Sequence, residues 1–142
     1  MSPSISVITL GVSDLARSRR FYCEGLGFRD SNQSDEHIGF LHAGGVMLAL
    51  YPRHLLAEDA QLPAAGSGFG GITLARNVAT KEEVDAALVR AEKAGAHILK
   101  SAREVFWGGY SGYFADPDGH PWEIAYNPHW ELDENGLVLL PD

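Results

Sequence analysis

Residues 110–126 read YSGYFADPDGHPWEIAY, and this stretch decides the fold. Aromatic and apolar residues over Tyr110–Ala115 and Trp122–Tyr126 favour two strands. Between them, Asp116-Pro117-Asp118-Gly119 has the composition of a tight turn, because aspartate hydrogen-bonds locally and glycine tolerates a positive φ. We therefore predict a β-hairpin and give its turn no catalytic role. Since side chains alternate along a strand, Glu123 lies on the face opposite that of its two neighbours.

A helix and two more strands precede this hairpin. Thr80-Lys81-Glu82-Glu83 is a capping box, in which the threonine and the last glutamate satisfy two free backbone donors at the start of a helix. Apolar residues at helical spacing follow, and Gly95 stands where a left-handed residue ends the helix. With strands predicted at Ile72–Ala75 and His97–Ser101, the second half of the chain has the order strand, helix, three strands.

The first half repeats this order, with a strand at Ile5–Leu10, a helix near 14–24, and three short strands up to Tyr51. Ile8-Thr9-Leu10 also recurs as Ile72-Thr73-Leu74. Each half alone would expose an apolar sheet face, so the halves must pack or pair. We predict an α+β fold of two βαβββ modules in a single domain, residues 1–142. The expected boundaries are 5–52 for module one, 53–69 for a linker, 70–128 for module two and 129–142 for a tail with an edge strand near 137–140.

The composition excludes several classes of partner. The chain has 142 residues, 19 acidic against 11 basic ones, and a net charge of -8, which disfavours nucleic acid. No apolar run approaches the ~20 residues that span a bilayer, so we expect no membrane association. The single cysteine, Cys23, cannot form an intramolecular disulfide, and this favours a cytoplasmic location.

Several segments resemble the vicinal oxygen chelate (VOC) superfamily, which includes glyoxalase I, bleomycin-resistance proteins and extradiol dioxygenases. The resemblance covers residues 5–128. It rests on residues 10–22 (LGVSDLARSRRFY), 25–28 (GLGF) and above all 113–123 (YFADPDGHPWE). It implies a glyoxalase-like, cup-shaped mixed sheet flanked by helices, with the ligand site in the cup, and a homodimer.

In metal-dependent members of that family, His, Glu or Gln side chains on the first and last strands of both modules hold one divalent ion. The resemblance places these four positions at Val7, Ala49, Gly71 and Glu123, of which only Glu123 is a metal ligand. A catalytic metal needs about three protein ligands and an open position. We therefore expect that the usual metal site is lost and that the protein needs no cofactor.

A divalent metal is not excluded, because other residues could rebuild a site. The candidates are His42, Glu36, His37 and His120, although the histidines form no ligand-spaced motif.

Glu123 is the leading catalytic candidate. A carboxylate in the cup without a metal needs a raised pKa or a cationic partner, and either makes it a plausible general base or ligand anchor. The structural alternative is a carboxylate bonded to a neighbouring side chain.

Aromatic residues among glycines, over residues 106–113 (FWGGYSGY), suggest one wall of a ligand site. We name Trp107, Tyr110 and Tyr113 as candidate ligand contacts, together with His42. The alternative is that these aromatic rings belong to the core.

Three functions remain open. The leading hypothesis is a protein that binds a small organic molecule in its cup without the usual metal. The second is a glyoxalase-type lyase, isomerase or dioxygenase that uses Glu123, with or without a rebuilt metal site. The third is a drug-binding protein similar to bleomycin-resistance proteins, which bind a cationic antibiotic in acidic, aromatic-lined clefts of a dimer.

Overall fold

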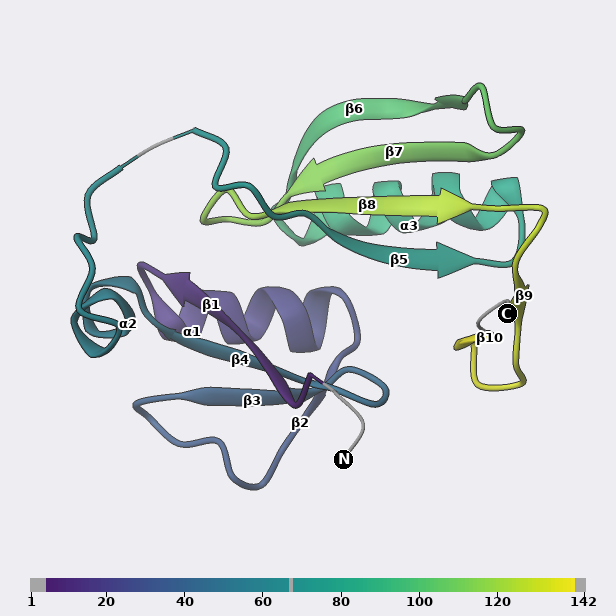
Figure 1. Cartoon of the computed structure of the whole chain (residues 1–142). Coiled ribbons are helices and arrows are strands. Elements are labelled where there is room, and N and C mark those ends of the chain that lie inside the picture. Colours follow the sequence, from purple (N-terminus) through teal and green to yellow (C-terminus); the bar gives the residue numbers. More distant parts are fainter. Residues whose placement is uncertain (1–4, 67, 140–142) are drawn as a thin grey trace. The chain divides into compact units, whose positions relative to one another are not determined.

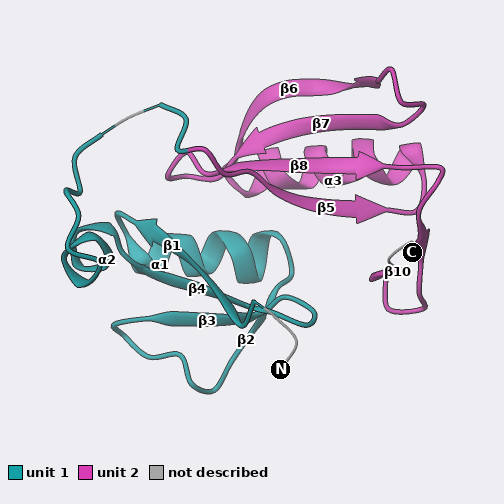
Figure 2. Cartoon of the chain, viewed as in Figure 1, with its two compact units in different colours: residues 1–70 teal, residues 71–142 magenta. Residues whose placement is uncertain are grey.

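The computed structural model describes residues 5–66 and 68–139. The chain forms two compact units, residues 1–70 (unit 1) and residues 71–142 (unit 2), which Figure 2 colours separately. Each unit has one four-stranded mixed sheet with a helix against one face (Figure 1). The predicted α+β fold of two βαβββ modules is confirmed. The single domain and the cup stay predictions.

Unit 1 has the strand order β1-β4-β3-β2, in which β1 and β4 are parallel and the other pairs antiparallel. Its elements are β1 (Val7–Val12), α1 (Leu15–Arg19), η1 (Arg20–Gly25), β2 (Arg29–Asp30), β3 (Gly39–His42), β4 (Met47–Pro52) and α2 (Arg53–Asp59). The helix α2 occupies the start of the predicted linker.

The first helix begins where the sequence predicts and then widens. Asp14 caps it, since its side chain accepts a hydrogen bond from the backbone N–H of Arg17 at 3.0 Å. From Arg20 onward the helix is a π-helix, and the N–H of Leu26 reaches the carbonyl of Phe21 at 2.9 Å. The widened turn adds Phe21 to the core beside Tyr22, which helical spacing alone did not indicate.

Unit 2 has the matching strand order β5-β8-β7-β6, with β5 and β8 parallel. Its elements are β5 (Leu74–Val78), α3 (Lys81–Ala94), β6 (His97–Glu104), β7 (Tyr110–Ala115), β8 (Pro121–Tyr126), β9 (Glu131–Leu132) and β10 (Val138–Leu139). The capping box is confirmed: Thr80 Oγ1 accepts from the Glu83 N–H at 3.1 Å, and Glu83 accepts from the Ala79 N–H at 2.8 Å. The helix ends at Gly95, which has a φ of 116°.

The strand β5 begins later than the sequence suggests. The prediction Ile72–Ala75 is wrong at its start, since Gly71 has a φ of 88° and Ile72 is 70% exposed before the strand. The register shows why the short sequence repeat misleads. Ala49 and Glu123 are each the third residue of corresponding strands, β4 and β8. Ala49 pairs with Thr9, whereas Glu123 pairs with Ala75, so Thr9 corresponds to Ala75. The segments Ile8-Thr9-Leu10 and Ile72-Thr73-Leu74 are therefore not structurally equivalent.

The tail also differs from the prediction. The strands β9 and β10 pair with each other as a small antiparallel hairpin, and up to residue 139, where the described part of the chain ends, no edge strand of the tail joins either main sheet. The end of the predicted edge strand, residue 140, lies outside the described residues.

Candidate functional site

Glu123 lies on the face of the β5–β8 sheet that is opposite α3, which we call the Glu123 face. Trp122 and Ile124, its neighbours along β8, are buried on the side that α3 covers (Figure 1). Across the sheet, Glu123 registers opposite Ala75 on β5 and Tyr113 on β7. Registered residues share a face, so Tyr113 is on the Glu123 face as well.

Tyr113 and Glu123 form a cross-strand pair of a phenol and a carboxylate. Burial and the charge of Glu123 raise the pKa of the Tyr113 phenol above its usual value. The phenol therefore stays protonated at neutral pH and can donate a hydrogen bond. A ligand oxygen could accept this bond, while Glu123 acts as a base or as an acceptor for a ligand hydroxyl.

The residues around this pair on the Glu123 face are small. Ala75 stands beside Glu123 on β5, Ala125 follows it on β8, and Ser111 and Ala115 flank Tyr113 on β7. Among the residues of β7 and β8 around this pair, these small neighbours leave the phenol and the carboxylate as the largest groups. Both side chains are half-buried, so they are partly accessible to a ligand.

The structure does not bring all the predicted aromatic contacts together. Tyr110 registers with Tyr126 on the α3 side of the sheet, and its hydroxyl donates to Asp85 of α3 at 2.8 Å. Trp107 lies in the turn between β6 and β7, with its ring over Gly109: a Cβ built on Gly109 would lie 1.8 Å from that ring. Of the three aromatic candidates, Tyr113 alone is adjacent to Glu123.

His42 belongs to unit 1. It is exposed at the end of β3, where it registers with Met47 and Arg29. Two of the other residues suggested for a rebuilt metal site, Glu36 and His37, form an exposed pair at 3.4 Å. The third, His120, is half-buried just before β8, and its backbone N–H donates to Asp116 Oδ1 at 2.8 Å.

The equivalent of Glu123 in unit 1 is Ala49, which is 1% exposed. Ala49 registers with Thr9 and Phe40, as Glu123 registers with Ala75 and Tyr113. The polar pair of unit 2 thus has an apolar counterpart, Ala49 and Phe40, in unit 1.

The same register corrects one of the predicted metal-ligand positions. In unit 1, Ala49 pairs with Thr9, and Val7 lies two residues before Thr9. In unit 2, Glu123 pairs with Ala75, and Thr73 lies two residues before Ala75. Thr73, and not Gly71, is therefore the equivalent of Val7. Valine, alanine and threonine beside one glutamate do not fit a divalent ion that needs about three imidazole or carboxylate ligands. Over residues 5–66 and 68–139, no three His, Cys, Asp or Glu side chains are grouped to hold a metal.

Sequence reasoning missed one residue of this face. Lys100 of β6 registers opposite Tyr113. Tyr113 therefore lies between Lys100 on β6 and Glu123 on β8, in one row across the sheet. The strand β6 is irregular, and simple alternation along it gives the wrong partner. A signal was nonetheless present, because Gly112 on the facing strand suggests a close approach of another backbone.

Comparison with known proteins identifies the family. The model of the Glyoxalase/Bleomycin resistance protein/Dioxygenase superfamily matches residues 4–124. The chain belongs to this superfamily, as the resemblance in sequence suggests. A comparison with curated proteins found no match to this chain.

Solved structures agree with this assignment. A glyoxalase-related enzyme from Fulvimarina pelagi is 39% identical, with a TM-score of 0.88 over 98% of this chain and 99% of that one. A hypothetical protein from S. aureus is 25% identical, with a TM-score of 0.77 over 89% of this chain and 95% of that one. A glyoxalase/bleomycin resistance protein/dioxygenase family enzyme from Burkholderia phytofirmans PsJN is 24% identical, with a TM-score of 0.76 over 85% and 96%, and this last likeness concerns the fold.

None of the described helices has the length and apolar character that crossing a bilayer requires.

Proposed function

We propose that this protein binds a small polar organic molecule on the Glu123 face, with Tyr113 and Glu123 as its central contacts. The observation that carries the proposal is the cross-strand pair itself. A half-buried phenol and a half-buried carboxylate stand opposite each other on adjacent strands, with small side chains beside them on β5, β7 and β8. Such a pair offers one donor and one acceptor at fixed spacing, which suits a ligand with neighbouring oxygens.

We further propose that binding needs no divalent metal. The donor chemistry supports this, because Val7, Ala49 and Thr73 leave Glu123 without the partners that a metal site requires. The function of Glu123 then follows from its contact with Tyr113.

The binding proposal is tested by a thermal-shift screen of small polar organic compounds, with protein that has been treated with a chelator. Hits are compared among wild type, Glu123→Gln and Tyr113→Phe. We expect both variants to lose the stabilisation by the same compounds. Glu92→Gln on α3 and Tyr110→Phe on the α3 side of the sheet are the matched controls. Hits that survive in both site variants would contradict the proposal.

A second candidate function is enzymatic proton transfer. It is favoured by the contact between a protonated phenol and a carboxylate, and by the glyoxalase-related enzyme that is 39% identical to this chain. Glu123 would accept a proton from a carbon next to a ligand carbonyl, while Tyr113 would donate a hydrogen bond to the carbonyl oxygen. Return of the proton from Glu123 to the same carbon would complete an exchange. Return to the former carbonyl carbon would complete an isomerisation, with the proton of the neighbouring hydroxyl passing to the former carbonyl oxygen.

Deuterium incorporation tests this candidate. Hydroxyacetone in D₂O is followed by NMR, and exchange of its C–H groups above the uncatalysed rate is expected with wild type. Exchange that is lost in Glu123→Gln and reduced in Tyr113→Phe would support proton transfer. Equal rates with and without the protein would leave binding alone as the function.

The homodimer and the cytoplasmic location are part of the proposal. Leu99 of the edge strand β6 is 52% exposed, and such edges favour pairing with another chain. Light scattering after size-exclusion chromatography tests the dimer. The drug-binding alternative is tested by the thermal-shift screen, with bleomycin among the compounds.

A further inference from the structure

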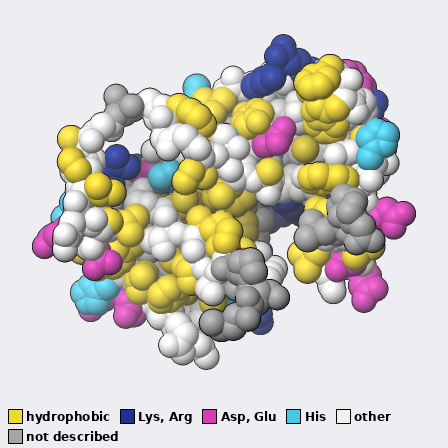
Figure 3. Space-filling view, viewed as in Figure 1, with side chains coloured by type: hydrophobic (Ala, Val, Ile, Leu, Met, Phe, Trp, Pro, Cys, Tyr) yellow, Lys and Arg dark blue, Asp and Glu magenta, His cyan; other side chains and the backbone are white. Residues whose placement is uncertain are grey.

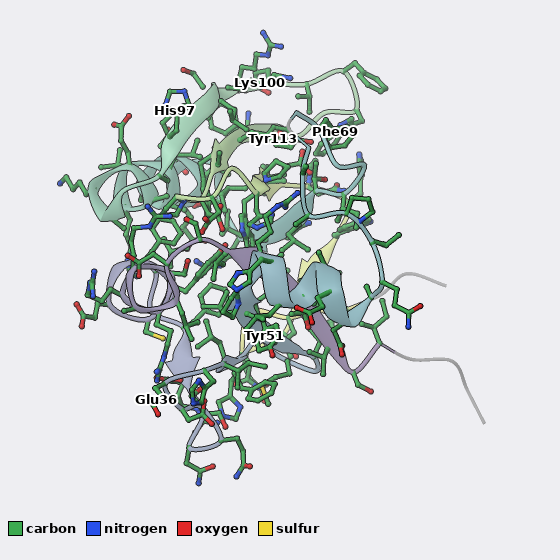
Figure 4. The ribbon with its side chains drawn as sticks, turned by 90° about the vertical axis from the view of Figure 1, so that its left-hand side faces the viewer. Glu36, Tyr51, Phe69, His97, Lys100 and Tyr113 are labelled. Carbon is green, nitrogen blue, oxygen red and sulfur yellow. The ribbon has the colours of Figure 1, made fainter. Side chains whose placement is uncertain are left out.

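The row of residues that contains Glu123 and Tyr113 continues onto β6 at Lys100. Lys100 registers opposite Tyr113, so the order across the sheet is Ala75, Glu123, Tyr113, Lys100. Figure 4 labels Lys100 and Tyr113 on neighbouring strands. Cβ atoms of directly opposite residues are about 4.5–5.5 Å apart. A ligand in contact with the Tyr113 phenol is therefore within reach of the Lys100 side chain.

The strand β6 is distorted on both sides of Lys100. Its register to β7 shifts between Ile98 and Lys100, and shifts again between Lys100 and Arg103. Bulges of this kind re-aim side chains and are common beside functional sites. Gly112 of β7 makes room for the distortion, since a Cβ there would lie 2.8 Å from the carbonyl oxygen of Lys100.

The ammonium of Lys100 has no ion-pair or hydrogen-bond partner in the part of the chain that the structure describes. Lys81 is different, because its ammonium bonds Glu104 at 2.6 Å on the α3 side. In the space-filling view, basic side chains gather over β6 and an acidic side chain lies over β7 and β8 (Figure 3). In a chain with a net charge of -8, the ammonium of a half-buried lysine without an acidic partner is suited to bind an anion.

We propose that Lys100 makes the site specific for a small carboxylic acid. The carboxylate of the ligand pairs with the Lys100 ammonium, and a hydroxyl or amino group at its other end donates to Glu123. Because neighbouring strands are about 4.8 Å apart, the backbones of β6 and β8 are separated by roughly 10 Å. Two functional groups of a small molecule can bridge this distance, since both protein side chains lean over the strand between them. The inference rests on the proposed function, because it concerns the same site.

Matched pairs of acids and primary amides that carry a hydroxyl group test the inference, for example lactic acid with lactamide and 4-hydroxybenzoic acid with 4-hydroxybenzamide. Each compound is titrated into the ¹⁵N-labelled protein, and chemical-shift changes give both the dissociation constant and the place of binding. In wild type we expect the acids to bind about fivefold more tightly than their amides, because one partly exposed ion pair separates the two. The preference should disappear in Lys100→Met and persist in Lys100→Arg. Lys93→Met, at the end of α3, is the charge-matched control and should keep it.

The two proposals fail in different ways. If amides bind at Tyr113 and Glu123 as tightly as acids, or if Lys100→Met keeps the preference, the role of Lys100 is wrong while the binding site stands. If neither series shifts the resonances of Tyr113 and Glu123, both proposals are contradicted. Lys100→Gln supplies a second neutral variant in case Lys100→Met fails to fold, which circular dichroism shows.

Discussion

Tyr113 and Glu123 stand directly opposite each other on the antiparallel strands β7 and β8, and burial, together with the charge of the carboxylate, raises the pKa of the phenol. A second tyrosine of β7, Tyr110, donates to Asp85 on the opposite side of the same sheet. Two tyrosines three residues apart therefore have separate acidic partners. This arrangement allows each contact to be tested with the other as its control.

The first prediction concerns the ionisation of these two phenols. Burial raises the pKa of Tyr113 and Glu123 raises it further, whereas the hydrogen bond to Asp85 is the largest cause of the raised pKa of Tyr110. In Glu123→Gln the pKa of Tyr113 should fall toward its usual value, because the charge that favours the neutral phenol is gone. Tyr110 should not change. In Asp85→Asn the pKa of Tyr110 should fall toward its usual value, and the pKa of Tyr113 should not change.

Titration of ¹³C-labelled tyrosine by NMR measures both pKa values in one experiment. The raised values also have a consequence for stability. They stabilise the folded chain below the ordinary tyrosine pKa of about 10, and this contribution is lost as the pH rises through the folded values. A Tyr113 resonance that titrates identically in wild type and Glu123→Gln would show that the pair does not exist in solution.

A second prediction concerns Asp30 in unit 1. Burial opposes the ionisation of this carboxyl, but hydrogen bonds from Ser34 and Arg19 and the charge of Arg19 outweigh it and lower the pKa. The Arg19 guanidinium donates to Asp30 at 2.5 Å, and the Ser34 hydroxyl donates at 2.6 Å. Asp30→Asn should therefore reduce the free energy of unfolding by about 1 kcal/mol at pH 7.

The sign of the pH dependence follows from the lowered pKa. The contribution of Asp30 is present above its unfolded pKa of about 4 and is lost as the pH falls through the folded value. Urea unfolding should therefore separate Asp30→Asn from wild type at pH 7 and not at pH 2. Asp59→Asn, at the end of α2, is the control and should match wild type at both values. If the difference in free energy of unfolding between Asp30→Asn and wild type grows toward low pH, the stabilising role of the Asp30 carboxylate is contradicted.

A third prediction concerns Gly112, which permits the close approach of β6. A Cβ at this position would lie 2.7 Å from Leu88 Cδ1, 2.8 Å from the Lys100 carbonyl oxygen and 2.9 Å from the Ala102 nitrogen. Two of these atoms belong to the backbone and cannot move freely, so Gly112→Ala should lower the free energy of unfolding by about 1–3 kcal/mol. Gly45→Ala is the control, because its Cβ would have no neighbour within 4 Å. Equal stability of the two variants in chemical denaturation would count against the bulged path of β6.

Local sequence patterns predicted those parts of the fold whose structure depends on a few adjacent residues. The turn after β7 is an example: Asp116 Oδ1 accepts from the backbone N–H groups of Asp118 and His120 at 2.9 and 2.8 Å, and Gly119 has a φ of 89°. The capping box at Thr80 is another. Both motifs carry their own hydrogen bonds, so the sequence specifies them without reference to the rest of the chain.

The parts that the sequence did not predict depend on contacts between elements. The start of β5 is set by its pairing with β8, and the exposed Ile72 shows that an apolar residue before a strand need not belong to it. The bulges of β6 depend on Gly112 in the neighbouring strand. For the same reason Glu123 could be named as a candidate from the sequence, while Lys100 could be placed in its row only by the register of the sheet.

The most direct test of the central claim is an NMR titration of the chelator-treated, ¹⁵N-labelled protein with a library of small polar organic compounds. We predict that binding compounds shift resonances on β6, β7 and β8 around Lys100, Tyr113 and Glu123, without added metal. The shifts should be absent in Glu123→Gln. If shifts in these strands occur only after a divalent ion is supplied, or if binding compounds act at other residues, the account of a metal-independent site on this face is contradicted.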